Sequence, residues 1–429
     1  MSVAAITVSL VAGLASADAA PSPGTPSTPT MPVPTRFLDP ATAIGGPRLA
    51  AMGVIVDTRS GVPAPPPVNA VSYVIADLDT GEVLAAKAPH ATLPPASTIK
   101  ALTAAYLLPR INRSRWYAAE PGDAAARGTR IGLVPGLSYT GEQLFQALLM
   151  GSANDAAYML ARLDGGLPAT VAGENELART LGAADTTVLD PSGLDADGQT
   201  SSAYDLALIG RYAMRSAEFR RLVVTKHVDF PGRVLTPTSS PGSRTSASAT
   251  AVPTMKSPSG PRLTYALDNH NGLLYNYQGT IGIKNGWTDQ AHRTFIGAAT
   301  RDGHTYLVTL MYGVDASQWR PTAQLLDWAF AHGNAASPVG RLLEPGEESP
   351  TTSTTTGASS PSTAAVPSDI GGGARAMTPV AAQAVPHALP TGWLELSVIT
   401  VLLAAVLVAS ASGWAAYRHH RQPRHQRRH

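Results

Sequence analysis

Two residues near position 100 have the types and the spacing of a nucleophile and its base. Ser97 and Lys100 stand three apart in PPASTIKALTA, where a helix is expected to begin after the two prolines. Side chains three apart lie on one face of a helix, one turn from each other. A serine hydroxyl becomes a useful nucleophile when a neighbouring base takes its proton. The alternative is a polar first turn with a solvated lysine, and this pair alone does not decide between the two.

Two further polar groups follow at a break in a helical pattern. The segment GSANDAA supplies a hydroxyl, Ser152, and an amide, Asn154, directly after Gly151. These groups could line the same site as the first pair. Serine and asparagine are also common caps at helix starts, so ordinary capping is the competing interpretation.

A second lysine, Lys284, ends the apolar part of GIKNGWT and precedes Gly286. The chain has only five lysines against 27 arginines, so the choice of lysine here needs a reason. A glycine in this position fits an edge strand whose backbone another segment approaches closely. The competing interpretation is a lysine that protects an exposed sheet edge from pairing.

Taken together, the three motifs resemble the S-x-x-K, S-x-N and K-T-G set of penicillin-binding proteins and serine β-lactamases, in the same order. The wider sequence agrees, with LDTGEVLAAKAP before the first motif and LGAADTTVLDPSGLDADGQTSSAYDLALIGRYA between the second and the third. On these motifs, residues 66–335 are similar to the serine D-alanyl-D-alanine carboxypeptidases, the low-molecular-mass penicillin-binding proteins.

The resemblance implies a hydrolase that needs no cofactor and no metal. Ser97 would attack the carbonyl between the two D-alanines of a peptidoglycan stem peptide, and β-lactam antibiotics would acylate the same hydroxyl. Lys100 would act as base and Ser152 as proton relay, while Asn154 would hold the substrate backbone. The backbone N–H groups of Ser97 and Trp287 would bind the oxyanion.

The third motif departs from the family pattern. Asn285 stands where the family has a threonine whose hydroxyl binds the terminal carboxylate of the substrate. An amide N–H also donates to a carboxylate, but its reach differs. The resemblance therefore assigns Lys284, Asn285, Gly286 and Trp287 to substrate binding. Lys284 would also keep Lys100 partly neutral, because a nearby cation disfavours a second one.

Other functions fit parts of this pattern less well. A class A β-lactamase needs a glutamate for deacylation, and the nearest candidate, Glu174, has the helical context GENELARTLGA rather than an E-x-x-L-N loop. A cell-wall-binding protein of the same fold with weak turnover is favoured only by Asn285. Endopeptidase action on cross-links would use the same residues. Zinc peptidase chemistry is disfavoured, because no H-E-x-x-H occurs and the histidines of the domain are isolated.

Strands and helices must bring these residues together. Strand pairs that turn at Asp79-Thr80-Gly81 and at Asp302-Gly303 are predicted near the two ends of the domain, with helical patterns between them. We therefore expect an α+β, penicillin-binding or serine β-lactamase-like fold, in which an antiparallel sheet from both ends packs against a helical region. The expected elements are hairpins at 71–89 and 293–313 and helices at 97–109, 140–163 with a break at Gly151, 201–222 and 316–333.

The rest of the chain divides by composition. The apolar stretch followed by ADAA at 1–19 is typical of a signal peptide, although no basic residue precedes it. Segments 20–45 and 341–392 are rich in Pro, Ser and Thr, and we expect disordered linkers there, the second a stalk. The domain is expected at 46–340, with a surface loop or insertion at 236–262.

A membrane anchor is predicted near the C-terminal end. Residues 396–417 carry no charge over 22 positions, a length that can span the core of a bilayer. We expect a transmembrane helix at 393–417 and a basic cytoplasmic tail at 418–429, by the positive-inside rule. The catalytic domain would then lie outside the cytoplasm, on the cell membrane. A net charge of +2 with scattered arginines argues against a nucleic-acid partner, and the absence of cysteine excludes disulfides.

Overall fold

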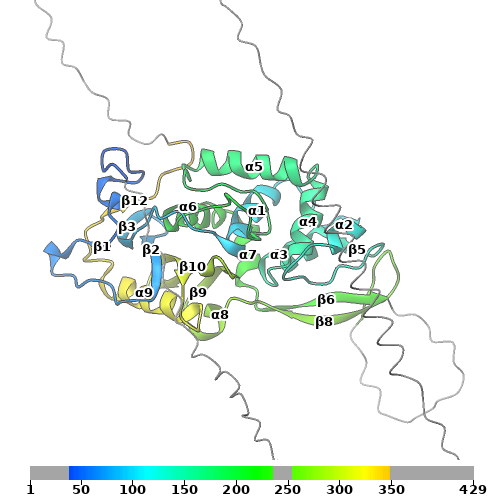
Figure 1. The fold of residues 1–429 in the computed structure, drawn as a ribbon. Coiled ribbons are helices and arrows are strands. Elements are labelled where there is room, and N and C mark those ends of the chain that lie inside the picture. Colours follow the sequence, from blue (N-terminus) through cyan, green and yellow to red (C-terminus); the bar gives the residue numbers. More distant parts are fainter. Residues whose placement is uncertain (1–37, 235–253, 348–429) are drawn as a thin grey trace, which may run out of the picture. The chain divides into compact units, whose positions relative to one another are not determined.

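A seven-stranded antiparallel sheet forms the centre of the domain (Figure 1). The structure, a computed structural model, describes residues 38–234 and 254–347. The strand order is β1-β3-β2-β11-β10-β9, and β12 pairs with the start of β3. The strands are Val54–Val56 (β1), Ala70–Asp77 (β2), Glu82–Lys87 (β3), Thr280–Thr288 (β9), His292–Arg301 (β10), His304–Gly313 (β11) and Gly340–Arg341 (β12).

Both predicted hairpins are confirmed. β2 pairs with β3, and β10 pairs with β11 as far as Arg301 opposite His304, which leaves Asp302 and Gly303 as a two-residue turn. Both turn residues have positive φ, 50° and 80°, as a type I′ hairpin turn requires. β2 also pairs with β11, so strands from the two ends of the domain meet in one sheet, as the sequence predicts.

Helices occupy the region between the two sets of strands. The first motif lies on a 3-10 turn, Ala96–Ile99 (η3), which continues as Lys100–Leu107 (α1). The predicted break at Gly151 is confirmed, because Gly141–Leu149 (α3) ends before it and Asn154–Leu163 (α4) begins after it. The other helices are Pro47–Ala50 (η1), Thr58–Ser60 (η2), Pro121–Ala124 (α2), Leu167–Thr180 (α5), Ala203–Ala213 (α6), Ala217–Val224 (α7), Leu273–Asn276 (α8) and Trp319–His332 (α9).

The single helix predicted at 201–222 is wrong, since the structure has two helices there. α6 ends at Ala213 and α7 begins at Ala217. The hydroxyl of Ser216 accepts a hydrogen bond from the Phe219 N–H at 3.2 Å and so caps the second helix. A capping serine gives a partner to a first-turn donor that otherwise has none, and this favours a new helix start over continuation.

The sheet is buried on both faces. Val74 and Ala76 of β2 belong to the apolar cluster on the side of α6, whereas Tyr73 and Ile75 belong to the cluster on the side of α9. α6 and α9 therefore cover opposite faces (Figure 1). A strand that is buried on both faces contains a continuous apolar run instead of an alternating pattern, as AVSYVIA does here.

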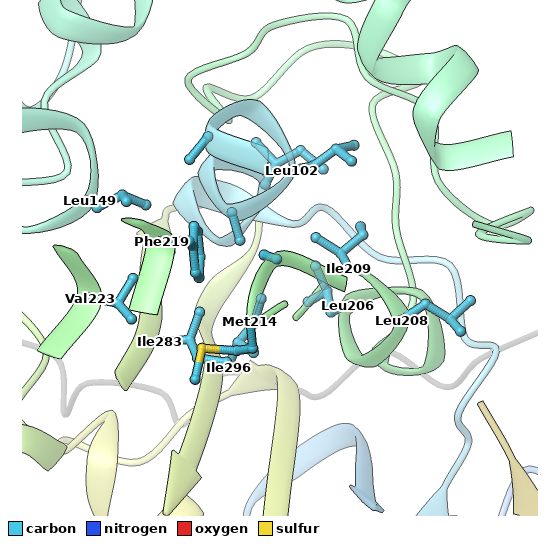
Figure 2. Close-up of a cluster of buried hydrophobic side chains, with 14 of the residues drawn as sticks. Leu102, Leu149, Leu206, Leu208, Ile209, Met214, Phe219, Val223, Ile283 and Ile296 are labelled. Carbon is cyan, nitrogen blue, oxygen red and sulfur yellow. The ribbon is translucent and has the colours of Figure 1, made fainter. Parts of the chain in front are cut away.

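The larger apolar cluster connects the helix and the strand that carry the two motif lysines. Figure 2 shows Leu102 of α1 and Ile283 of β9 in one group of buried side chains, together with residues of α6 and α7. Leu102 is two residues beyond Lys100, and Ile283 directly precedes Lys284. Full burial of such a side chain stabilises the fold by about 1.5–3 kcal/mol. The core thus fixes α1 and β9 relative to each other.

A smaller sheet lies where the sequence predicts a surface loop. His227–Val234 (β6) pairs with Arg262–Asp268 (β8), which also pairs with Thr254–Met255 (β7). The loop predicted at 236–262 is therefore wrong at Thr254, Met255 and Arg262, which lie in strands, whereas residues 256–261 form a turn between them and residues up to 253 lie outside the described residues. A further pair of strands, Trp116–Ala118 (β4) and Ser138–Thr140 (β5), lies between α1 and α3 in the sequence.

Arg262 explains why the end of this segment is ordered. Its side chain is fully buried, and its guanidinium donates to the carbonyl groups of Gly232, Pro231 and Ser138 at 2.8, 3.1 and 2.7 Å. A buried cation is tolerated only when its donors are matched in this way. The segment TMKSPSGPR gives no sign of such matching, because all three acceptors are backbone atoms of other strands.

Several predicted segments lie outside the described residues. They are the signal peptide at 1–19, most of the linkers at 20–45 and 341–392, the transmembrane helix at 393–417 and the tail at 418–429. Within residues 38–234 and 254–347, none of the helices combines the length and the apolar character that crossing a bilayer requires. The start of the stalk predicted at 341 is wrong, because Arg341 pairs with β3 and Leu342 and Leu343 are buried in the larger apolar cluster.

Candidate active site

Ser97 lies in a 3-10 turn that neighbouring hydroxyls hold in place. The carbonyl of Pro95 accepts hydrogen bonds from the hydroxyls of Thr98 at 2.5 Å and Thr294 of β10 at 2.9 Å. Ala96, just before the serine, has a φ of 48°, a conformation that persists only where the surroundings hold it. The turn therefore presents Ser97 in one orientation against the end of the sheet.

Lys100 is fully buried behind Ser97. Its Nζ lies 2.9 Å from Ser97 Oγ, 2.7 Å from Asn154 Oδ1 and 2.5 Å from the carbonyl oxygen of Ser192. The orientation of the Asn154 amide is fixed, because its Nδ2 donates to the Arg127 carbonyl at 2.7 Å. Two of the three partners of Lys100, the amide oxygen and the carbonyl, can therefore only accept hydrogen bonds.

This arrangement suits a neutral amine. A neutral lysine amine has two N–H donors and one lone pair, and the two pure acceptors take both donors. The lone pair then faces Ser97 Oγ, the one partner that can donate. Burial places the pKa of Lys100 well below its usual value, and repulsion by Lys284 lowers it further, against a smaller opposing effect of Asp190 and Asp155. Lys100 is therefore set to accept the Ser97 proton.

Lys284 and Ser152 form a second pair in the same cluster. Lys284 is fully buried, and its Nζ donates to Ser152 Oγ at 3.1 Å and to the carbonyl oxygen of Asn285 at 2.6 Å. Burial lowers its pKa to about 7. Ser152 itself has a φ of 56° at the break between α3 and α4, an unusual conformation that the surrounding helices hold. Because Ser152 Oγ accepts from Lys284, its own O–H is left to donate elsewhere.

The second motif also holds a neighbouring loop. The Asn154 N–H donates to the Thr129 carbonyl at 2.7 Å, and the Asp155 carboxylate accepts from the backbone N–H groups of Ile131, Gly132 and Leu133 at 2.8–3.0 Å. Several backbone donors on one carboxylate make a strong, charge-assisted anchor. Asn154 thus connects the loop to Lys100, and the sequence-based role of holding substrate backbone stays a prediction.

β9 approaches Ser97 so closely that only glycine fits at position 286. A methyl group on Gly286 would lie 2.9 Å from the backbone nitrogen of Ser97 and 2.4 Å from Thr294 Oγ1. This confirms the close approach predicted for the edge strand. Trp287 follows with its side chain 53% exposed, so it does not join the buried cluster. The oxyanion role of the Ser97 and Trp287 N–H groups stays a prediction.

Two partners of the motif residues were not found from the sequence. The Ser192 carbonyl accepts from Lys100, and Gln318 bonds both to the Asn285 amide and to the Gly286 carbonyl. The segment DPSG around Ser192 lies within the sequence that resembles the family, but its residue types predict no role for a carbonyl oxygen. No sequence signal pointed to Gln318.

Glu174, the candidate deacylation base of a β-lactamase, is buried away from these contacts. Both carboxyl oxygens are buried, and neither has a hydrogen-bond partner among the described residues. Burial raises the pKa of Glu174 to about 8, and the Thr103 hydroxyl gives it no hydrogen bond, because that hydroxyl donates to the Pro191 carbonyl at 2.8 Å. Glu174 is therefore a protonated acid within the helical region at neutral pH.

A Glu174→Gln variant is expected to be more stable than the wild type above neutral pH. The unfolded state releases this proton near pH 4.5 and the folded state only near pH 8, so the native protein loses stability as pH rises between these values. Glutamine has no such proton. We expect the stabilisation by the substitution to be about 3 kcal/mol greater at pH 8 than at pH 5, as measured by denaturant unfolding. Glu176→Gln, an exposed position on the same helix, should show no such pH difference.

Three groups that are isolated in the sequence meet elsewhere in the described residues. His90 Nδ1 lies 2.7 Å from an oxygen of Asp185, and its Nε2 lies 3.0 Å from the Ile44 carbonyl oxygen. Asp205 is close by, and burial together with the charge of Asp185 raises its pKa to about 7. Both ring nitrogens of His90 have partners, so the cluster ties the start of the domain to the segment before α6.

The family comparisons agree with this geometry. The model of the D-alanyl-D-alanine carboxypeptidase family matches residues 59–315. The chain is 37% identical over 279 residues to the D-alanyl-D-alanine carboxypeptidase DacB2 of Mycobacterium tuberculosis, which covers 64% of this chain and 86% of that protein. It is 27% identical over 304 residues to the D-alanyl-D-alanine carboxypeptidase DacA of Escherichia coli, which covers 66% of each.

Solved structures show the same fold. A D-alanyl-D-alanine carboxypeptidase from Mycobacterium tuberculosis matches with a TM-score of 0.57 and 36% identity over 66% of this chain and 98% of that one. A DD-transpeptidase from Streptomyces matches with a TM-score of 0.55 and 25% identity over 63% and 100%. The α+β fold expected from the resemblance to penicillin-binding proteins is confirmed. The chain belongs to the D-alanyl-D-alanine carboxypeptidase family.

Proposed function

We propose that this enzyme removes the terminal D-alanine from peptidoglycan stem pentapeptides through an acyl-enzyme on Ser97. The observation that supports this most directly is the 2.9 Å contact between Lys100 Nζ and Ser97 Oγ, with both other partners of Lys100 restricted to accepting. A base with its lone pair on a serine hydroxyl activates that hydroxyl for attack on a carbonyl.

Acylation uses the two lysine–serine pairs in turn. Lys100 takes the Ser97 proton as Oγ bonds to the carbonyl carbon of the penultimate D-alanine. The carbon–nitrogen bond to the terminal D-alanine then breaks, and the leaving amine must gain a proton. Ser152 is suited to supply it, because its oxygen accepts from Lys284, which replaces the proton that Ser152 gives up. When water hydrolyses the Ser97 ester, Lys100 returns its proton to Ser97 Oγ, and the proton released by the attacking water restores Lys284.

Lys284 links substrate binding to the protonation state of Lys100. A terminal carboxylate beside Lys284 gives this buried amine the counter-ion that favours its charged form. A charged Lys284 in turn disfavours a charge on Lys100, since repulsion between the two already lowers the pKa of Lys100. Binding of a carboxylate-bearing substrate would thus keep the base neutral. Penicillin carries a carboxylate near its reactive carbonyl and would act on the same groups.

We infer a location for the enzyme from its proposed substrate and from its sequence. Peptidoglycan lies outside the cytoplasmic membrane, and residues 396–417 are long and apolar enough to anchor the chain there. We propose a signal peptide at 1–19, an extracytoplasmic catalytic domain, a single span at 393–417 and a cytoplasmic basic tail. The part of the predicted stalk beyond residue 347 would connect the domain to the membrane.

The full-length protein is expected to release D-alanine from a synthetic stem pentapeptide and to form a stable adduct with labelled penicillin. D-Alanine release is measured with a coupled assay, and adduct formation by gel fluorescence and mass spectrometry. If the protein forms a penicillin adduct but releases no D-alanine, it is a binding protein with weak turnover. If it hydrolyses penicillin rapidly, it is a β-lactamase. Cleavage of a cross-linked dimer peptide, tested in parallel, reports endopeptidase action.

A further inference from the structure

Gln318 contacts the third motif twice, at the start of α9. Its Nε2 donates to the Gly286 carbonyl at 3.0 Å, and its Oε1 accepts from Asn285 Nδ2 at 3.0 Å. The segment before it is held to the sheet, because the guanidinium of Arg293 on β10 donates to the Ala316 carbonyl at 2.9 Å. Gln318 is thus a fixed neighbour of the strand that carries Lys284.

The direction of these hydrogen bonds is determined by the backbone. The Gly286 carbonyl can only accept, so Gln318 must turn its Nε2 towards it. This leaves Oε1 facing Asn285, which must therefore present Nδ2. The Oδ1 of Asn285 then faces Lys284 Nζ at 3.5 Å. The chain of bonds allows only one orientation of each amide.

The amides of Asn285 and Gln318 each keep one unused donor. Each NH₂ group has two hydrogens, and the contacts of Gln318 and Asn285 use one on each. Both side chains are partly exposed, so the remaining hydrogens are accessible. Asn285 lies beside Lys284 and Gln318 lies beside Asn285, so two N–H donors and one amine are available to the two oxygens of a carboxylate. A threonine at position 285 would offer a single hydroxyl to the carboxylate. Such a hydroxyl would not need a neighbouring amide to orient it.

We infer that Gln318 is a positioning residue for the carboxylate-binding group of this enzyme, which orients the Asn285 amide towards the terminal carboxylate of the substrate. The inference rests on the proposed function, since it takes the carboxylate to be that of a D-alanyl-D-alanine peptide or of a β-lactam. It makes the role of Gln318 conditional on an asparagine at position 285.

A double-mutant cycle between positions 318 and 285 tests this dependence. Gln318→Ala should lower the second-order rate constant of acylation by penicillin about tenfold, with a matching rise in KM for the pentapeptide and little change in kcat. The same substitution in an Asn285→Thr background should change these values less than threefold. Gln324→Ala, at an exposed position on the same helix, should leave them unchanged. Equal effects of Gln318→Ala in both backgrounds would overturn the inference.

The charge of the ligand provides a second readout. Gln318→Ala should slow acylation by penicillin but not by its methyl ester, which has no carboxylate. Gln318→Glu, which places a negative charge beside the ligand, should slow penicillin further than alanine does, by about 100-fold. If penicillin and its ester are affected equally, the residue has a purely structural role and the inference fails. Thermal unfolding of each variant shows whether it is folded.

The two hypotheses fail in different ways. If the wild type is acylated by penicillin but releases no D-alanine, the proposed hydrolysis is wrong, while the acylation cycle still decides the role of Gln318. If the wild type releases D-alanine and the cycle shows no coupling, only the inference on Gln318 is wrong. If the wild type does neither, the proposed function is wrong and the inference falls with it.

Discussion

Replacing Ser97 with alanine is expected to lower the rates of both penicillin acylation and D-alanine release by about 10⁴-fold or more. The acyl-enzyme requires an oxygen at this position, and among the described residues Ser97 supplies the hydroxyl that is hydrogen-bonded to Lys100 Nζ. The size of the effect follows from the loss of the nucleophile, which positioning and oxyanion stabilisation do not replace. Labelled penicillin and the coupled D-alanine assay measure the two activities.

The variant should otherwise remain folded. The Ser97 side chain makes no contact on which the turn depends, because the hydroxyls of Thr98 and Thr294 hold the Pro95 carbonyl. Thermal unfolding of Ser97→Ala should therefore match the wild type within a few degrees. Ser114→Ala, at an exposed serine, should keep full activity. A penicillin adduct on Ser97→Ala would show that another residue is the nucleophile.

The sheet and most of the helices could be predicted because local patterns determine them. The Asp302-Gly303 turn requires positive φ at two positions, and few residue pairs adopt that conformation readily. The break at Gly151 and the apolar spacing of α9 are similarly local. The break between α6 and α7 was missed, because the apolar spacing continues through Met214 and conceals the cap at Ser216. The smaller sheet was missed because its pairing depends on a strand about 30 residues away and on a buried arginine.

The candidate site, too, could be predicted from the sequence only in part. The types and spacing of Ser97, Lys100, Ser152, Asn154 and Lys284 predicted a cluster, and the structure brings these residues together through the contacts of the two lysines. What the sequence did not contain is the set of partners that decides the protonation of the cluster. A backbone carbonyl such as that of Ser192 has no sequence signature, since every residue has one. Gln318 was missed because its contact depends on where α9 begins.

The preference for lysine over arginine at these two positions has a physical reason. Both amines are completely buried within one cluster, where a guanidinium would stay charged and would need more donors matched than the site offers. An amine can lose its proton, and burial lowers the pKa of Lys284 to about 7. The pair can therefore hold one charge between them near neutral pH. An arginine at either position would fix two charges or remove the base.

A Lys100→Arg variant is accordingly expected to lose about 10³-fold in the rate of penicillin acylation, within the range that removal of a general base produces. The guanidinium keeps a positive charge but has no lone pair to take the Ser97 proton. Lys226→Arg, the same change at an exposed lysine, should have no effect. Stopped-flow acylation of both variants and the wild type gives the comparison.

The dependence on pH separates a catalytic loss from a structural one. Because the pKa of Lys100 lies well below its usual value, the neutral base is available near neutral pH, and acylation by the wild type should slow as pH falls and Lys100 gains a proton. The residual acylation of Lys100→Arg should lose the part of this pH dependence that comes from Lys100, since arginine does not titrate there, and should keep only the part that comes from Lys284. If part of the variant protein were only misfolded, the amplitude of the acylation signal would be smaller, but the pH profile of the rate would be that of the wild type. Retention of both the rate and the profile in Lys100→Arg would mean that the Ser97 proton goes elsewhere, and Ser152 with Lys284 would then be the pair to test as the base.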